Sequence, residues 1–211
     1  MTFLEAALEY AENGIPVFPL QEKEKKPFKG TSGLKEATTN VEQIKTWWGY
    51  REKANNGIPM GSQSGLCGID IDFKDGCDPK FPEKLPPTVL VRTPTGGLHA
   101  FFKYPTGGIK NGLRLEQGAT VRAEGYYFVG VPSIHPETNT AYEFVTRGLV
   151  DGEISELPQW ILDFAGEENA RKETFTVPEI IRSGERNDTF WKYACSLRGK
   201  GHNLTEIIAG L

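Results

Sequence analysis

The sequence predicts an α+β domain in which a mostly antiparallel mixed sheet is flanked by helices, with a small helical extension at the C-terminus. Two patterns predict this fold class. Residues 3–11 and 41–48 repeat apolar side chains at helical spacing, whereas residues 57–145 alternate short β-type runs with turn residues. Helices that precede a hairpin-rich segment are typical of α+β folds.

Capping residues mark the two N-terminal helices. The Thr2 hydroxyl can accept from the backbone of Glu5, and the Glu5 carboxylate can return the bond, which is the capping-box pattern. Gly14 suits the end of this first helix. Asn40 can cap the second helix. Between the two, the apolar residues 15–20 predict a short strand.

The middle of the chain supplies the strands of the sheet. Runs of β-branched and aromatic residues, separated by Gly, Pro and Asn, predict six strands. They span residues 66–73, 88–93, 98–104, 120–122, 126–131 and 141–145, with loops over residues 21–33 and 74–87.

Helical patterns return near the C-terminus. They cover residues 157–164 and 186–197 and a last segment capped by Asn203, with a Gly/Glu/Lys-rich connector over residues 166–176. We therefore predict a core domain over residues 1–150 and a helical extension over residues 151–211. We expect the extension to continue in a longer protein.

Composition excludes some classes of protein. The chain has 211 residues and a net charge of −4, whereas a protein that simply coats nucleic acid is usually basic. An enzyme with an acidic, metal-binding site is compatible with that charge. No apolar run reaches the roughly 18 residues that a membrane span needs. Three cysteines without metal-ligand spacing favour the reducing cytoplasm, and we expect this segment to be a monomer.

Two aspartates stand one residue apart in a strand-forming run. Alternate side chains of a strand share a face, so Asp70 and Asp72 project together while Ile69 and Ile71 enter the core. Paired carboxylates repel each other, and a cation removes that cost. Oxygen ligands at this spacing suit Mg²⁺ or Mn²⁺, which would bridge to substrate phosphates. The alternative is an ordinary amphipathic strand with a solvated polar face.

A glycine turn precedes a histidine between two β-type runs. Gly96 and Gly97 predict a hairpin turn, which places His99 near the start of the second strand. Paired glycines let the backbone pass close to a ligand, and an imidazole can donate to a phosphate oxygen. A purely structural role for His99 is the alternative.

A serine-rich turn precedes the aspartate strand. Residues 61–65 include Ser62 and Ser64 and have the small side chains of an anion-binding concavity, although any tight turn uses such residues.

A later strand adds charged candidates. If this strand continues regularly, Thr120, Arg122 and Glu124 share one face. Arg122 could then clamp a phosphate, and Glu124 could approach a bound metal. A surface salt bridge between the two is the alternative.

In this order, the four motifs resemble those of the prim-pol domain of the archaeo-eukaryotic primase superfamily, the bifunctional primase-polymerases of phages and plasmids. Residues 69–72 are similar to the family's hydrophobic-Asp-hydrophobic-Asp motif, and residues 95–99 to its small-residue turn before a histidine. The turn at 61–65, the Lys25-Lys26-Pro27 loop and residues 121–133 are similar as well. The resemblance covers residues 3–145.

The resemblance implies an RRM-like catalytic core that joins NTPs or dNTPs on a single-stranded DNA template by a two-metal mechanism. It implies metal ligation by Asp70 and Asp72. Glu124 is a further candidate catalytic residue from its expected place on the strand, not from the resemblance. A helicase region often follows this domain in the family. The implied nucleotide-binding residues are Ser62, Ser64, His99, Arg122 and Lys26, and the implied DNA-binding residues are Lys25, Lys29 and Arg186.

One position departs from the family pattern. The family usually has a third acidic residue where this chain has Thr120, and a hydroxyl is a much weaker Mg²⁺ ligand than a carboxylate. Glu124 could substitute, the site could hold one metal firmly, or catalysis could be impaired. The rival functions are a non-catalytic nucleotide- or DNA-binding replication module, which Thr120 favours, and a metal-dependent nuclease.

Overall fold

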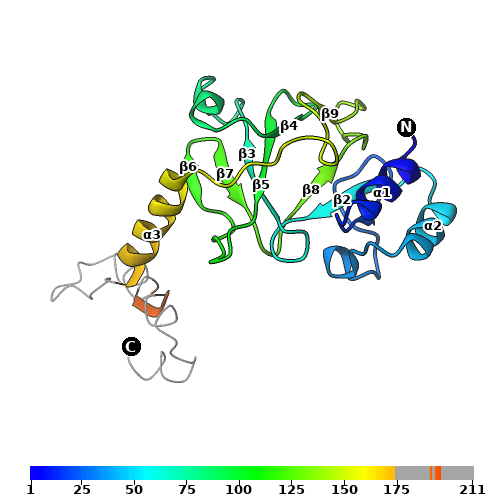
Figure 1. Ribbon diagram of the computed structural model, residues 1–211, viewed down its shortest axis with the longest axis horizontal. Helices are drawn as coiled ribbons and strands as arrows, with labels where there is room; N and C mark the ends of the chain where they lie inside the picture. The colour runs from blue at the N-terminus through cyan, green and yellow to red at the C-terminus, as the bar shows by residue number, and fades with distance from the viewer. Residues whose placement is uncertain (174–190, 192, 196–211) are drawn as a thin grey trace. The chain divides into compact units, whose positions relative to one another are not determined.

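A computed structural model of the chain describes residues 1–173, 191 and 193–195. The chain divides into two compact units, Met1–Pro158 and Gln159–Leu211. The predicted domain division after residue 150 stays a prediction. The fold described below is that of the first unit; Figure 1 labels its helices α1 and α2 and most of the strands of its two sheets.

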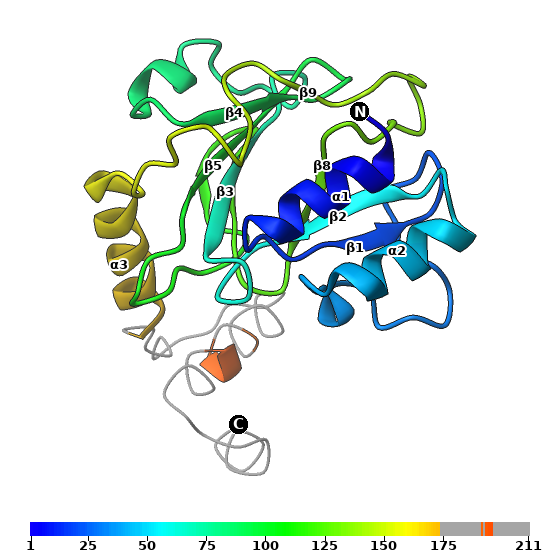
Figure 2. The same cartoon turned by 45° about the vertical axis from the view of Figure 1, so that its right-hand side comes forward.

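Two helices begin where their capping residues predict. Helix α1 (Phe3–Glu12) has the Thr2–Glu5 capping box, and helix α2 (Val41–Tyr50) is capped by the Asn40 side chain. Both helices contact the small sheet, and they also contact each other (Figure 2). Their buried faces therefore form one side of the core, together with the short 3-10 helix η1 (Gly33–Glu36).

The small sheet has three antiparallel strands in the order β1 (Phe18–Leu20), β2 (Asn55–Pro59) and β8 (Tyr127–Gly130). Strand β1 is shorter than the predicted strand over residues 15–20. Strand β2 was not predicted, because Asn-Asn-Gly has low β-propensity.

Buried asparagine side chains account for strand β2. The Asn55 amide donates to the carbonyls of Glu24 and Ile134 and accepts from the Ile134 N–H, so its polar atoms are satisfied in the interior. Hydrogen bonds to the backbone thus replace the β-branched packing that usually stabilises a strand.

The large sheet has six antiparallel strands in the order β6-β7-β3-β5-β4-β9. Its strand order places the aspartate strand between the histidine strand and the threonine strand. The bounds are β3 Leu66–Ile71, β4 Val89–Arg92, β5 Leu98–Lys103, β6 Arg114–Glu116, β7 Ala119–Arg122 and β9 Glu143–Phe144.

The core fills the space between the two sheets. Phe128 of β8 packs edge-on against Phe101 of β5, with the ring centroids 5.3 Å apart. Val91 of β4 is paired in register with His99 of β5, so the apolar face of the large sheet continues directly into the polar candidate residues. The antiparallel sheets and flanking helices confirm the predicted α+β class.

Several elements differ from their predicted bounds. Strand β6 lies between the predicted strands over 98–104 and 120–122, where no element was predicted, and the 3-10 helix η2 (Phe81–Lys84) lies in the predicted loop over 74–87. Helix α3 (Gln159–Glu173) runs through most of the segment 166–176 that was predicted as a connector, so that prediction was wrong for residues 166–173. The segment is helical because its Glu, Ala, Arg and Lys residues are good helix formers. Most of the predicted helix over 186–197, and all of that after Asn203, lie outside the described residues.

Gly118 sets the register between β7 and the end of β3. Its φ of +70° is a left-handed conformation, and a Cβ there would collide with the Asp72 carbonyl oxygen. A hydrogen bond fixes the two backbones at this point, because the Asp72 N–H donates to the Gly118 carbonyl at 2.7 Å. In the part of the chain that the structure describes, no helix has both the length and the apolarity to cross a bilayer.

Candidate active site between the two sheets

A pocket of about 240 Å³ opens where the two sheets meet. The large sheet contributes the aspartate strand and His99, and the small sheet contributes the aromatic strand β8. The lining is Lys25, Asp70, Ile71, Asp72, Thr93, Thr95, His99, Tyr126, Tyr127, Phe128, Val129 and Tyr142. The pocket therefore combines carboxylates, a histidine, a lysine and three tyrosines.

Asp70 lies at the centre of the candidate site. Its neighbours in register are His99 on β5 and Thr120 on β7. Asp70 Oδ2 accepts from Arg122 Nη2 at 2.9 Å and from Arg122 Nε at 3.3 Å. His99 Nε2 lies 3.7 Å from the other carboxylate oxygen, Asp70 Oδ1. The alternation of the strand brings Asp72 into the same pocket, and Asp72 Oδ1 accepts from the Lys74 N–H at 2.9 Å.

His99 is held as a buried, neutral imidazole. Its ring stacks on Phe128 with the centroids 4.0 Å apart, and burial lowers the pKa of His99 to about 4. The Asp70 carboxylate raises this pKa in opposition, and Lys25 and Arg122 lower it further. His99 Nδ1 is buried and has no hydrogen-bond partner among the described residues. Such an orphaned atom calls for an explanation, and a water or ligand is a common one.

The lowered pKa of His99 predicts a stability loss in mild acid. The folded-state pKa lies below the ordinary value of 6.5, so as pH falls from 6.5 towards 4 the unfolded chain takes up a proton that the folded chain does not. Between pH 7.5 and pH 4.5 the wild type should therefore lose roughly 2–3 kcal/mol of unfolding free energy more than His99→Phe, which keeps the stack. Urea unfolding without divalent cations measures this difference.

The difference in unfolding free energy between wild type and His99→Phe reports on His99 alone. Burial also lowers the pKa of His135, but His135 is present in both proteins and its effect cancels in the difference. Equal acid sensitivity of wild type and His99→Phe would show that His99 takes up its proton as readily in the folded chain as in the unfolded one.

Hydrogen bonds to backbone carbonyls fix the position of Lys25 at the pocket. The Tyr127 hydroxyl donates to the Lys25 carbonyl at 2.7 Å, and buried Asn55 donates to the preceding carbonyl of Glu24 at 3.0 Å. The resemblance implied a DNA-binding role for Lys25 and a nucleotide-binding role for Lys26. The structure places Lys25 in the pocket lining, whereas Lys26 and Lys29 are exposed and do not line it. Arg186 lies outside the described residues.

Three tyrosines of the pocket were missed by the sequence reasoning. Tyr126 stacks under the Arg122 guanidinium, whose Cζ lies 4.3 Å from the ring centroid. Tyr142 lies beside His99, with ring centroids 5.8 Å apart, and Tyr127 anchors Lys25. For Tyr126 and Tyr127 the signal was the Tyr-Tyr-Phe run after Gly125, which was interpreted only as part of a strand.

Glu124 is brought together with Ser62 rather than with Asp70. Strand β7 ends at Arg122, so the regular continuation that would place Glu124 on the shared face does not occur. The Glu124 carboxylate accepts from the Ser62 N–H and the Ser62 hydroxyl, both at 2.8 Å. The Ser62 N–H is the main cause of the lowered pKa of Glu124. Ser64 closes the same turn by accepting from the Leu66 N–H.

Asp70 and Asp72 are donors that fit a divalent cation. Asp70 and Asp72 face one pocket, and Mg²⁺ is commonly held by one or two carboxylates together with substrate phosphates. Within the described ranges, no group of three His, Cys, Asp or Glu side chains is placed to hold a metal. The register position beside Asp70, where a third carboxylate could contribute, is occupied by Thr120.

Comparison with known proteins agrees with this geometry. No curated protein matches the chain. A family model described as the N-terminal domain of bifunctional DNA primase/polymerase matches residues 7–160, which include both sheets and the whole pocket. Membership implies primase or polymerase activity, a DNA template, nucleotide substrates and, typically, divalent metals. The chain therefore belongs to the bifunctional DNA primase/polymerase N-terminal domain family.

Proposed function

We propose that this domain synthesises and extends primers by template-directed nucleotidyl transfer from NTPs or dNTPs on single-stranded DNA. The observation that carries the proposal is the pocket lined by Asp70, Asp72, His99 and Lys25, with the Arg122 guanidinium bound to Asp70. Carboxylates beside fixed positive charges and a neutral imidazole are the groups that a metal-bound triphosphate requires.

The reaction joins a primer 3′-hydroxyl to the α-phosphate of the incoming nucleotide. The hydroxyl gives up its proton to solvent, its oxygen forms a bond to the α-phosphorus, the bond from the α-phosphorus to the bridging oxygen breaks, and pyrophosphate leaves. A divalent cation held by Asp70 and Asp72, when bound, supplies charge stabilisation for the oxygens on phosphorus. The chain's own residues position the triphosphate around this centre.

Arg122 and Lys25 supply the fixed positive charge. The Arg122 guanidinium is oriented by Asp70 and by the Tyr126 ring, and it retains donors for a phosphate oxygen. Lys25 lies at the pocket with its backbone fixed, so its ammonium group can reach phosphate without reorganising the loop.

His99 has a lowered pKa and is neutral at pH 7, so it donates a hydrogen bond without repelling a cation. Glu124 has an indirect role, because its carboxylate stabilises the Ser62 turn that precedes β3. The turn that the sequence predicted as an anion site therefore binds this chain's own carboxylate.

We infer that the domain acts in phage or plasmid replication and that the native protein continues into a helicase region. Both inferences rest on the family resemblance alone, and a helicase would supply the single-stranded template on which this domain acts.

Primer synthesis tests the proposal directly. With single-stranded DNA, Mg²⁺ or Mn²⁺ and labelled nucleotides, we expect short products that require template, cation and all complementary nucleotides. Gel electrophoresis of the products measures this. Degradation of the template without added nucleotide would instead indicate a nuclease.

Thr120 favours a second candidate, a nucleotide-binding replication module with impaired catalysis. Its hydroxyl stands beside Asp70 where the family usually has a carboxylate. Binding of Mn²⁺ and nucleotide without product on any template would support this module, whereas template-dependent products would exclude it.

A further inference from the structure

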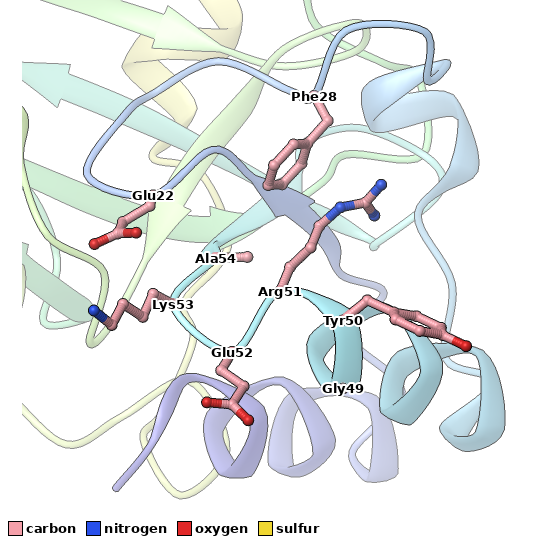
Figure 3. Close-up of a pocket in the computed structure, with 8 residues that line it drawn as sticks. All are labelled: Glu22, Phe28, Gly49, Tyr50, Arg51, Glu52, Lys53 and Ala54. Atoms are coloured by element: carbon pink, nitrogen blue, oxygen red, sulfur yellow. The ribbon is translucent and has the colours of Figure 1, made fainter.

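A second pocket, of about 440 Å³, lies beside the end of helix α2. One wall is the segment over residues 21–30, here called the lysine loop, and the other is the C-terminal end of α2 with the residues that follow. Figure 3 shows the eight residues that line it: Glu22, Phe28, Gly49, Tyr50, Arg51, Glu52, Lys53 and Ala54. This pocket is separate from the candidate active site.

The second pocket combines aromatic rings with cations. The Arg51 side chain reaches to Phe28, and its Cζ lies 4.3 Å from the ring centroid (Figure 3). Tyr50 is 88% exposed, and it projects outward from the last turn of α2. An exposed aromatic ring beside Arg and Lys is a usual element of a single-strand binding groove, because a base stacks on the ring while the cations contact the phosphates.

The charge around this pocket differs in sign from the charge of the whole chain. The lysine loop contains four lysines and two glutamates, and residues 49–54 add Arg51 and Lys53 against Glu52. The surroundings are therefore net positive, although the chain carries −4 overall. A polyanionic strand is the ligand that this local excess of positive charge suits.

The lysine loop connects the two pockets. Lys25 lines the candidate active site, whereas Glu22 and Phe28 of the same loop line the second pocket. Hydrogen bonds hold the loop in this position, because Asn55 donates to the Glu24 carbonyl and Gln21 donates through its side chain to the Pro27 carbonyl. A strand bound in the second pocket would therefore be next to the loop that borders the nucleotide.

From these contacts we propose that the second pocket binds single-stranded DNA, with one base stacked on Tyr50 and the backbone contacted by Lys53. The proposal deepens the proposed function, since it gives the template a location outside the active site. Glu22 and Glu52 limit the affinity, which allows the strand to move on after each nucleotide is added.

Binding of a fluorescein-labelled oligo(dT), measured by fluorescence anisotropy in EDTA at low salt, tests the proposal on the full chain. Tyr50→Ala should weaken binding by roughly 5- to 150-fold, the range of one lost base stack. Tyr50→Phe keeps the ring and should bind within about twofold of wild type. Unchanged affinity in Tyr50→Ala would overturn the stacking role.

A pair of charge variants tests the same site through a gain of affinity, which misfolding cannot mimic. Glu52→Lys should tighten oligo(dT) binding several-fold and steepen its salt dependence by about 0.7 in log–log slope, the contribution of one further phosphate contact on a single strand. Glu83→Lys makes the same change of charge at an exposed position outside the second pocket. Equal gains in both variants would show a general charge effect and overturn the assignment.

The binding assay contains neither nucleotide nor divalent cation, so its outcome is independent of catalysis. A chain that binds oligo(dT) through Tyr50 but makes no primer would contradict the proposed function while leaving the DNA site intact. If the wild type makes primers but Tyr50→Ala binds oligo(dT) with unchanged affinity, the proposed function stands and the DNA site at Tyr50 is contradicted.

Discussion

Replacing Asp72 by Asn should lower nucleotide incorporation by at least about 100-fold, since even residues that only support metal ligands typically change metal affinity or activity 10- to 100-fold. The amide removes the negative charge that a cation needs, but it keeps an oxygen that can accept from the Lys74 N–H. The fold should therefore survive. Primer extension at saturating Mn²⁺ and nucleotide measures the loss, and thermal unfolding checks the fold.

Asp75→Asn is the matched control for this prediction. It makes the same chemical change three residues along the chain, at an exposed aspartate that does not line the candidate active site. We expect it to retain wild-type activity. Full activity in Asp72→Asn would contradict the metal-ligand role, and equal losses in both variants would point to a general charge effect.

Replacing Thr120 by Asp should convert the site to one that binds Mn²⁺ strongly without nucleotide. The new carboxylate would stand beside Asp70 in register, so repulsion should lower the melting temperature in EDTA. Mn²⁺ at about 100 times its dissociation constant should then raise the melting temperature by roughly 5–10 °C. Nucleotide incorporation should rise about tenfold, which corresponds to about 1.4 kcal/mol of barrier.

Thr120→Asn separates charge from size in this experiment. The Asn side chain has nearly the same volume as Asp but no negative charge, so Mn²⁺ should shift the melting temperature of Thr120→Asn no more than that of the wild type. If the Mn²⁺ shift of Thr120→Asp also equals that of the wild type, the position beside Asp70 does not contribute to metal binding.

Local patterns predicted the helices and most strands because their causes are local. The capping box of Thr2 and Glu5 and the alternation around Asp70 depend on neighbouring residues alone, and both are found in the structure. Strand β2 could not be predicted in this way. Asn55 is stable in a strand because its partners lie near residues 24 and 134, far away in the sequence.

The candidate site was predictable in its residue types and less so in its pairings. Asp70, Asp72 and His99 come together because adjacent antiparallel strands align them. The pairing of Arg122 with Asp70, and of Glu124 with Ser62, depends on where β7 ends. Strand length is set by tertiary packing, so the sequence pattern alone favoured a continuous strand and a different partner for Glu124.

The constraint at Gly118 has a practical consequence for preparing this protein. A chain in which β7 had slipped by one residue along β3 would have the same amount of strand, yet Thr120 and Arg122 would point to the opposite side of the sheet. Circular dichroism would not distinguish the two forms. Titration of competent sites per mole of protein is therefore the appropriate measure of a correctly refolded sample.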